Sequence, residues 1–323
     1  MRYRSLGCTG LQVSEIGYGA WGIGARQWIG AEDAQSLAAL RAARDAGVNF
    51  FDTALAYGEG HSERLLARAF GASSEVIIAS KVPPKNLIWP ARPQSTLAEV
   101  FPRAHVLACL ENSLRNLGRE RLDLFQFHVW NDAWADDPEW LATVDEIKAA
   151  GKVRCIGISI NDHQPANSLR ALASGRIDVV QVIYNLFDQS PDDELFPVCA
   201  ARSIGVIARV PFDEGSLTGQ IRPDTSFPAE DWRHLYFAGD RKRQVWERVQ
   251  HLCRDLGIRP EDLPAIALRF CLSSPVVSTV IPGMRSPRHV QANAGASDEG
   301  PLTPAALAIA HAHRWVRNFY PVN

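Results

Sequence analysis

The sequence predicts a (β/α)8 TIM barrel, in which eight parallel strands alternate with helices. Three observations support this: short continuous apolar runs recur along the chain, segments with helical spacing separate them, and glycine often follows these segments. Continuous apolar runs are typical of strands buried on both faces, and strict alternation of strand and helix favours a parallel sheet. The length of 323 residues lies within the usual range of this fold.

Apolar runs rich in β-branched and aromatic residues indicate the strands. They are Val48–Phe51, Val76–Ser80, Leu122–His128, Val153–Ile158, Val179–Tyr184, Gly205–Val210 and Val277–Ile281. An earlier strand near Ser14–Gly19 brings the number to eight, which favours a closed barrel over an open doubly wound sheet. Before it, Tyr3–Val13 carries Gly7 and Gly10 around a turn and predicts an N-terminal β-hairpin that closes the bottom of the barrel.

The clearest helical segments lie between these runs. They are Asp33–Ala46, Val106–Leu117, Glu139–Ala150 and Leu169–Ser174, and glycine follows each of them, as it often does at a helix C-terminus. Two stretches, residues 82–101 and 212–241, are too long for simple connections and predict binding loops. We expect residues 1–323 to form one barrel domain, with these loops and a C-terminal tail, residues 303–323, as additions.

Composition argues against several classes of partner. The formal net charge of −2 argues against binding to nucleic acid or to an anionic membrane surface. The six cysteines are scattered without a CxxC pair, so neither a disulfide framework nor a metal site is expected. The N-terminus lacks the apolar core of a signal peptide, and no apolar stretch approaches the roughly 18 residues of a membrane span. The cytoplasm is therefore the expected location, and the oligomeric state is left open.

Polar residues interrupt the apolar runs at the end where barrel enzymes place their active sites. The second strand leads to Asp52 and Tyr57, the third to Lys81, and the fourth ends in His128. Each residue alone has an ordinary structural explanation, such as a loop cap for Asp52 or a surface lysine for Lys81. Their placement at three consecutive strand ends favours a shared chemical role.

This set of side chains suits proton transfer to a carbonyl oxygen. A free tyrosine has a pKa of about 10 and donates its proton reluctantly at neutral pH, but a neighbouring lysine ammonium lowers that pKa. A carboxylate keeps the lysine charged, and an imidazole can hydrogen-bond the oxygen as negative charge develops. Reduction of an aldehyde or ketone needs such a set, because the alkoxide must be protonated.

The segment from Asp52 to Glu63 has the sequence DTALAYGEGHSE and resembles the signature of the aldo-keto reductases. Further resemblance extends over nearly the whole chain, at Leu6–Ser14, Gly17–Trp21, Ser80–Lys81, Phe127–His128, Gly157–Ser159, Gln181–Asn185, Gly215–Gly219 and Ile281–Gly283. By this resemblance Asp52, Tyr57, Lys81 and His128 form a catalytic tetrad. Tyr57 would be the general acid for reduction and the base for oxidation.

The resemblance also implies a nicotinamide dinucleotide held without a Rossmann fold. The residues implied in cofactor binding are Gly19, Trp21, Ser159, Asn161, Gln181, Arg209, Pro211, Leu217, Gly219, Gly283, Arg285, Ser286, His289 and Asn293. Arg285, Arg288 and the start of the following helix favour an anionic group, so NADPH (NADP+) is expected and NADH is less favoured. The chain departs from the family pattern at Ile160, Arg209 and His289, where Asn, an aromatic residue, and Arg or Gln are common.

Aromatic residues are concentrated in the expected site loops. They are Trp21, Trp28, Trp89, Trp130, Trp134, Phe212, Trp232 and Tyr236. Of these, Trp89, Trp130 and Phe212 are predicted to bind the substrate. An aromatic-walled pocket favours a bulky or cyclic carbonyl compound, including a sugar.

The leading hypothesis is NADPH-dependent reduction of a small-molecule aldehyde or ketone. Two alternatives stay open: an NAD-linked sugar or polyol dehydrogenase that uses the same site, and a cofactor-sensing barrel subunit with little turnover. Cofactor preference separates the first alternative from the leading hypothesis. The second has no chemical need for Tyr57 and Lys81, so their presence argues against it.

Overall fold

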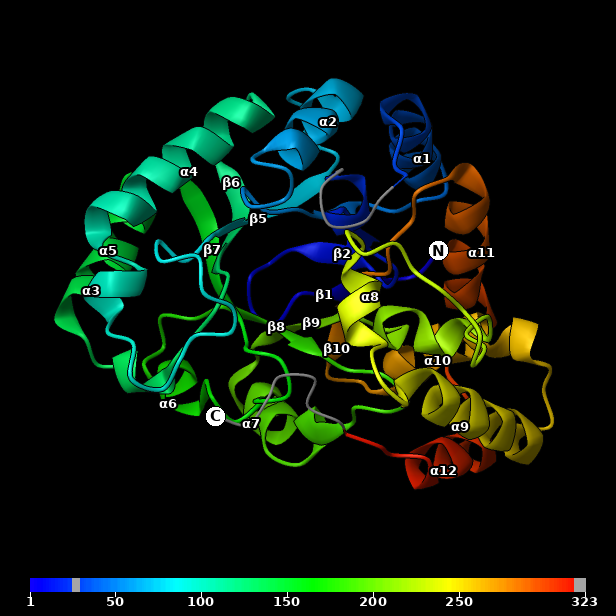
Figure 1. The fold of residues 1–323 in the computed structure, drawn as a ribbon. Coiled ribbons are helices and arrows are strands. Elements are labelled where there is room, and N and C mark those ends of the chain that lie inside the picture. Colours follow the sequence, from blue (N-terminus) through cyan, green and yellow to red (C-terminus); the bar gives the residue numbers. More distant parts are fainter. Residues whose placement is uncertain (25–29, 317–323) are drawn as a thin grey trace.

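The computed structural model describes residues 1–24 and 30–316, and its centre is a barrel of parallel strands (Figure 1). Strands pair in chain order; they are β3 (Tyr18–Gly19), β4 (Phe50–Asp52), β5 (Ile77–Val82), β6 (Leu122–Phe127), β7 (Val153–Ser159), β8 (Val179–Ile183), β9 (Gly205–Arg209) and β10 (Val277–Val280). Parallel bridges from Ile16 to Val280 and from Gly19 to Gly283 join the first strand to the last and close the barrel. The predicted (β/α)8 fold is confirmed.

The predicted hairpin is present at the N-terminal end of the barrel. Its strands, β1 (Tyr3–Ser5) and β2 (Gln12–Ser14), pair in antiparallel register. Leu6 and Val13 of this segment are fully buried in a cluster that includes Phe50 and Leu124 from the barrel strands. The hairpin thus covers the apolar interior of the barrel at this end.

Helices surround the strands (Figure 1). Those that connect successive strands or follow the last one are α1 (Asp33–Asp45), α2 (His61–Phe70), α4 (Arg103–Leu117), α5 (Pro138–Ala149), α6 (Leu169–Ala173), α7 (Leu195–Arg202), α10 (Leu263–Ser273) and α11 (Pro287–Glu299). The glycine-ended segments match α1, α4, α5 and α6, with ends that differ by a few residues. Gly118 after α4 has a φ of 62°, a left-handed conformation that glycine adopts without steric cost.

Additional elements lie in the long connections. They are α3 (Leu97–Val100) between β5 and α4, η4 (Asp213–Thr218), α8 (Trp232–Tyr236), α9 (Arg241–Leu256) and η5 (Pro260–Asp262) between β9 and α10, and α12 (Pro304–Ala312) near the C-terminus. Single 3-10 turns occur at η1 (Trp21–Ile23), η2 (Asp132–Trp134) and η3 (Ser190–Asp192). The two long connections begin at the carboxyl ends of β5 and β9, where they can form walls above the barrel.

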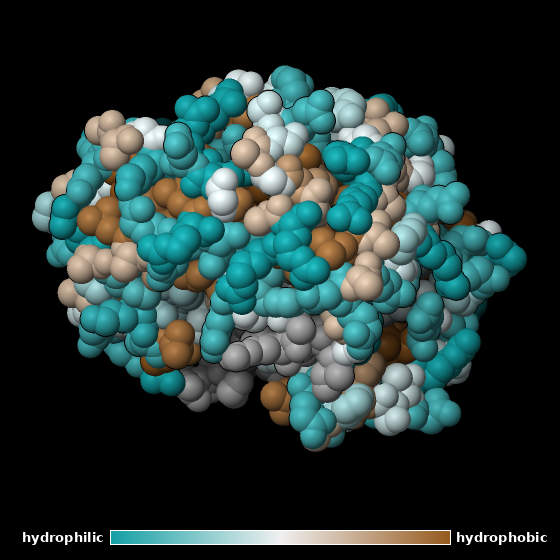
Figure 2. Space-filling model, turned by 90° about the horizontal axis from the view of Figure 1, so that it is seen from above, coloured by the Kyte–Doolittle hydropathy of each residue, from teal (hydrophilic) through white to brown (hydrophobic). Residues whose placement is uncertain are grey.

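The surface of the molecule is largely polar. Hydrophilic side chains cover most of the face in Figure 2, and hydrophobic ones occur there in small groups. Leu87 and Trp89 are large hydrophobic residues that are exposed, and both lie in the loop that follows β5. Among residues 1–24 and 30–316, no helix combines the length and the apolar composition that crossing a membrane requires.

Candidate active site

A cavity of about 1960 Å³ lies at the carboxyl ends of the barrel strands. Both long loops contribute to its walls, as the sequence predicted. Of the residues expected to bind cofactor or substrate or to act in catalysis, those that line it are Gly19, Trp21, Asp52, Tyr57, Trp89, His128, Ser159, Asn161, Gln181, Arg209, Pro211, Phe212, Gly219, Gly283, Arg285, His289 and Asn293. The site therefore occupies the face on which barrel enzymes place their chemistry.

The buried ammonium of Lys81 connects a carboxylate to a phenol. Its Nζ donates to Asp52 Oδ1 at 2.5 Å, to the carbonyl oxygen of Thr53 at 2.7 Å and to Tyr57 Oη at 3.4 Å. Strand register explains the first contact: Asp52 pairs with Ala79, and Lys81 lies two residues further on the same face of β5. The three contacts match the three donors of an ammonium group.

The carboxylate of Asp52 is held from two further strands. Gln181 Nε2 donates to Asp52 Oδ2 at 2.7 Å, and Gln126 Nε2 donates to the same oxygen at 3.2 Å. From the sequence, Gln181 was expected to bind the cofactor, whereas here its amide nitrogen contacts Asp52. Gln126 was not expected at the site, although an amide within the otherwise apolar run of β6 was a signal for a buried polar contact.

Burial sets the protonation states around Lys81. Burial raises the pKa of Tyr57 above its ordinary value, and the charge of Lys81 only partly offsets this effect. The expected lowering by lysine is therefore outweighed, and the phenol keeps its proton at neutral pH. Burial, together with the charges of Lys81 and Arg209, holds the pKa of His128 well below its ordinary value. The imidazole is thus neutral.

His128 lies against the phenol with an unused ring nitrogen. The ring centroids of Tyr57 and His128 are 5.6 Å apart, and the rings meet edge to face. Within the described part of the chain, the buried Nδ1 of His128 has no hydrogen-bond partner. Since an unsatisfied buried polar atom is costly, this nitrogen is suited to a partner that enters with a ligand.

Two tryptophans flank the phenol and the imidazole. The ring of Trp21 lies 6.5 Å from Tyr57, and that of Trp89 lies 5.9 Å from His128, both measured between centroids. They give the cavity an aromatic wall near the tetrad, and Phe212 lines the same cavity. A flat or largely apolar group would gain contact area there.

Trp130, which was expected to bind the substrate, does not line the cavity. Its side chain is fully buried and is not among the cavity-lining residues. The indole packs instead against Phe127, Trp134 and Trp140 in the core. A tryptophan after a strand can turn toward solvent or back onto the helices, and composition alone does not separate the two. Trp28 lies outside the described residues.

Two expected cofactor residues also lie off the cavity wall. Leu217 is fully buried in the core, and Ser286 caps α11 by accepting from the backbone N–H of His289 at 3.4 Å. Asn161 does line the cavity, but its Oδ1 accepts from the backbone N–H groups of Ala91 at 3.4 Å and Trp130 at 3.2 Å. Asn161 therefore ties together the loops that follow β5, β6 and β7.

Arg209 is held as one half of an ion pair. Its Nη2 donates to Asp162 Oδ1 at 2.6 Å and to the carbonyl oxygen of Ile160 at 2.8 Å. Both acceptors lie in the loop that follows β7, so the guanidinium bridges two strand ends across the cavity wall. Asp162 was not identified from the sequence, because nothing in its spacing marked it as the partner of Arg209.

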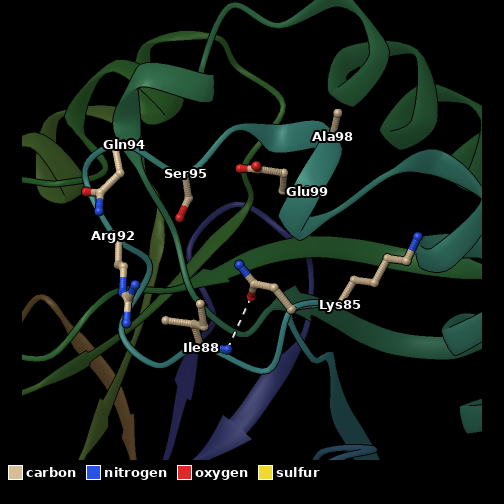
Figure 3. Close-up of a pocket in the computed structure, with 8 residues that line it drawn as sticks. Lys85, Ile88, Arg92, Gln94, Ser95, Ala98 and Glu99 are labelled. Atoms are coloured by element: carbon tan, nitrogen blue, oxygen red, sulfur yellow. Dashed lines mark hydrogen bonds between the residues drawn. The ribbon is translucent and has the colours of Figure 1, made fainter.

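A smaller pocket of about 560 Å³ lies beside the loop after β5 (Figure 3). Its walls include Lys85, Arg92 and Glu99, all of them exposed. Glu99 already completes a capping box with Thr96 at the start of α3. Its lining residues include no group of buried polar side chains like the one in the larger cavity. Among residues 1–24 and 30–316, no cluster of three or more His, Cys, Asp or Glu side chains could hold a metal ion.

The larger cavity has the charge and the size for a dinucleotide together with a substrate. Arg285, Arg288 and His289 line one part of it, where the chain enters α11. Guanidinium groups beside a helix N-terminus suit phosphate oxygens. The volume of about 1960 Å³ exceeds the roughly 300–1,000 Å³ of a usual ligand pocket. Burial lowers the pKa of His289, so this histidine adds no charge at neutral pH.

Comparisons of the sequence and of the structure with known proteins agree on one family. The model of the aldo/keto reductase family matches residues 15–314. The chain is 30% identical to the aldo-keto reductase YhdN of Bacillus subtilis over 90% of this chain and 87% of that protein. It is 27% identical to the NADH-specific methylglyoxal reductase of Escherichia coli, over 92% and 93% of the two chains. The holo form of the aldo-keto reductase AKR11C1 from Bacillus halodurans superposes with a TM-score of 0.77 at 25% identity, covering 97% and 96%. The chain belongs to the aldo/keto reductase family and is an oxidoreductase that uses a nicotinamide cofactor on carbonyl or alcohol substrates.

Proposed function

We propose that this protein reduces an aldehyde or ketone to the alcohol with NADPH, and that Tyr57 donates the proton. One observation carries the proposal: a buried lysine, fixed by Asp52, lies 3.4 Å from a phenol that opens onto the large cavity. A protonated phenol with an adjacent ammonium is suited to give up its proton when negative charge develops on a nearby oxygen.

Each of the four side chains has a separate role in the reaction. When bound, a nicotinamide cofactor would supply hydride chemistry at this site. Tyr57 then gives the proton of its Oη to the carbonyl oxygen, and Lys81 stabilises the resulting phenolate. Asp52 keeps Lys81 charged and oriented. The neutral ring of His128, beside the phenol, orients the carbonyl oxygen by a hydrogen bond.

Three groups of residues would hold the cofactor. Ser159 and Gln181 would bind the carboxamide, and Gly219 lies in the loop that would cross the diphosphate. We assign the adenosine end to four residues that line the cavity, Arg285, Arg288, His289 and Asn293. Two guanidinium groups favour the extra phosphate of NADPH. The Escherichia coli relative is an NADH-specific methylglyoxal reductase, and titration of this chain with NADPH and NADH tests the preference.

The substrate is a small carbonyl compound with a flat or bulky apolar part. Trp21, Trp89 and Phe212 support this, because all three line the cavity and the first two lie beside Tyr57 and His128. The six free cysteines fit a reducing compartment, which favours the cytoplasm. We also propose that residues 1–323 form one barrel domain.

Tyr57→Phe tests the assigned proton donor. Turnover of an aromatic aldehyde, followed by the loss of NADPH absorbance, should fall by at least about 10²–10⁴-fold, the usual contribution of a general acid. The Kd for NADPH, from quenching of tryptophan fluorescence, should stay within about threefold, because the ring is retained. Wild-type turnover in Tyr57→Phe would show that another group donates the proton.

Tyr3→Phe is the matched control. Tyr3 is half exposed in the hairpin, and its hydroxyl donates to the carbonyl oxygen of Gly47 at 2.8 Å, away from the cavity. It should keep wild-type turnover. Titration of both variants and the wild type with NADPH and NADH measures the cofactor preference in the same experiment, and a large preference for NADH would favour the NAD-linked dehydrogenase.

A further inference from the structure

Glu214 places a carboxyl group in the cavity wall close to two other carboxylates. It lies in η4, and Asp213 and Asp162 both act on it electrostatically. Within residues 1–24 and 30–316, the Glu214 carboxyl takes part in no hydrogen bond or ion pair. The two arginines near it are already engaged: Arg209 pairs with Asp162 at 2.6 Å, and Arg233 pairs with Asp231 at 2.7 Å.

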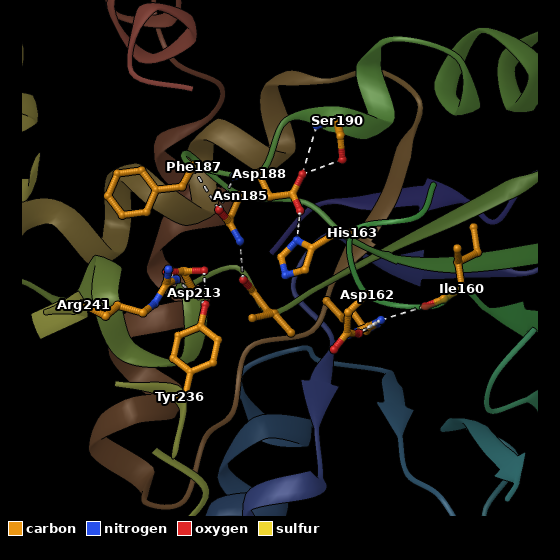
Figure 4. Close-up of polar contacts among 12 residues, drawn as sticks. Ile160, Asp162, His163, Asn185, Phe187, Asp188, Ser190, Asp213, Tyr236 and Arg241 are labelled. Atoms are coloured by element: carbon orange, nitrogen blue, oxygen red, sulfur yellow. Dashed lines mark hydrogen bonds and ion pairs between the residues drawn. The ribbon is translucent and has the colours of Figure 1, made fainter. Parts of the chain in front are cut away.

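The surrounding structure fixes the backbone that presents Glu214. Three non-glycine residues here have left-handed φ angles: Val210 at 54°, Asp213 at 46° and Glu214 at 54°. Such conformations are unfavourable for residues other than glycine and persist only where other contacts enforce them. The carboxylate of Asp213 provides the main contact, because it accepts from Tyr236 Oη at 2.6 Å and from Arg241 Nη2 at 3.0 Å, all three being buried (Figure 4).

The environment of Glu214 disfavours its ionised form. Burial, followed by the negative charges of Asp162 and Asp213, raises the pKa of Glu214 to about 8, while Arg209 and Arg233 act in the opposite direction. Arg233 also acts on Arg285 at the phosphate-binding part of the cavity. A ligand phosphate near Arg285 would therefore share one electrostatic environment with Glu214.

We propose that Glu214 couples dinucleotide binding to proton uptake: its carboxyl is neutral when an anionic dinucleotide occupies the cavity, and its ionised form opposes binding. The inference rests on the proposed NADPH-dependent function and adds a residue that controls cofactor affinity. Its basis is the position of Glu214. The contacts of Asp213 with Tyr236 and Arg241 keep the Glu214 carboxyl in the cavity, and the nearby guanidinium groups of Arg209 and Arg233 are paired with other carboxylates.

The direction of the pH dependence follows from linkage. If the neutral form binds the dinucleotide better, affinity is constant below the pKa of free Glu214 and falls as the pH rises through it. With that pKa at about 8, the Kd for NADPH should rise by up to about tenfold per pH unit above it. Two other groups near the bound dinucleotide titrate at a lower pH than Glu214. The second pKa of a phosphate monoester is about 6, and burial lowers the pKa of His289.

The test compares wild type with Glu214→Gln. NADPH affinity is measured by quenching of tryptophan fluorescence between pH 7 and about 9.5, a range that spans the pKa of about 8. Calorimetry at about pH 9, in two buffers with different ionisation heats, counts the protons taken up on binding. Wild type should show the rising Kd and an uptake approaching one proton. Glu214→Gln, which is neutral at every pH, should bind with a Kd constant within about twofold and no uptake.

Glu261→Gln is the matched control. Glu261 also lines the cavity, but it is exposed and pairs with Arg259 at 3.2 Å. It should keep the wild-type pH dependence. Far-UV circular dichroism verifies that both variants fold. A wild-type Kd independent of pH, or a Glu214→Gln Kd that still rises, overturns this inference while leaving the proposed function intact. Failure of wild type to bind NADPH or NADH at any pH overturns both.

Discussion

Replacing Lys81 by Met, Asp52 by Asn, or both together would measure how strongly the two buried charges depend on each other. Lys81 is fully buried, Asp52 is 2% exposed, and their charged atoms are 2.5 Å apart. Removal of one partner leaves the other charge in the barrel without its counter-ion. For a buried pair this costs about 3–5 kcal/mol of unfolding free energy.

The double variant should lose much less than the sum of the single losses. Met fills the volume of the lysine stem, and the amide that replaces the Asp52 carboxylate still offers an oxygen to Gln126 or Gln181. The carbonyl oxygen of Thr53 loses one donor, which costs about 1–3 kcal/mol. Against a sum of about 6–10 kcal/mol for the single changes, the interaction free energy should therefore be at least about 3 kcal/mol.

Urea denaturation at pH 7, followed by far-UV circular dichroism and tryptophan fluorescence, gives the four free energies of unfolding. Tyr3→Phe serves as a reference for a substitution outside the barrel. Additive losses, with an interaction free energy below about 0.5 kcal/mol, would refute the reasoning. They would mean that water or another group compensates each charge when its partner is removed.

Two further substitutions separate core from cavity. Trp130→Ala should lower the unfolding free energy by about 3–5 kcal/mol, because Trp130 packs in the core. The Kd for NADPH should not change. Weaker NADPH binding at unchanged stability would instead show that Trp130 contacts the ligand. Arg285→Ala should weaken NADPH binding by about 10–100-fold and NADH binding much less, the equivalent of a charged hydrogen bond of about 1.5–3 kcal/mol. Fluorescence titration measures both constants, and equal losses would remove Arg285 from the extra phosphate.

The barrel was predictable because its strands leave a local mark on the sequence. Parallel strands covered on both faces must be apolar throughout, and the runs at Val153–Ile158 and Gly205–Val210 match β7 and β9 with ends that differ by one residue. The first strand was located only approximately. β3 is two residues long, Tyr18–Gly19, and much of the closure comes from single bridges, which leave no periodic pattern.

The tetrad positions could be predicted for a different reason. In a parallel barrel the carboxyl end of every strand reaches the same face, so Asp52, Lys81 and His128 had to lie near one another. The direction of individual side chains was not predictable in this way. Gln181 contacts Asp52 from a distant part of the chain, and Trp130 turns toward Trp140 of α5 in the core; the strand pattern determines neither orientation.

The pKa values in the cavity predict different pH dependences for catalysis and for cofactor binding. Burial raises the pKa of Tyr57 and lowers that of His128, so neither group titrates between about pH 7 and 9, whereas the pKa of Glu214 is about 8. In this range, kcat at saturating NADPH should stay constant while kcat/KM for NADPH falls as the pH rises. In Glu214→Gln both quantities should be flat. A fall of kcat near pH 8 that persists in Glu214→Gln would instead place the titrating group in the tetrad, and the phenol would then be more acidic than its burial implies.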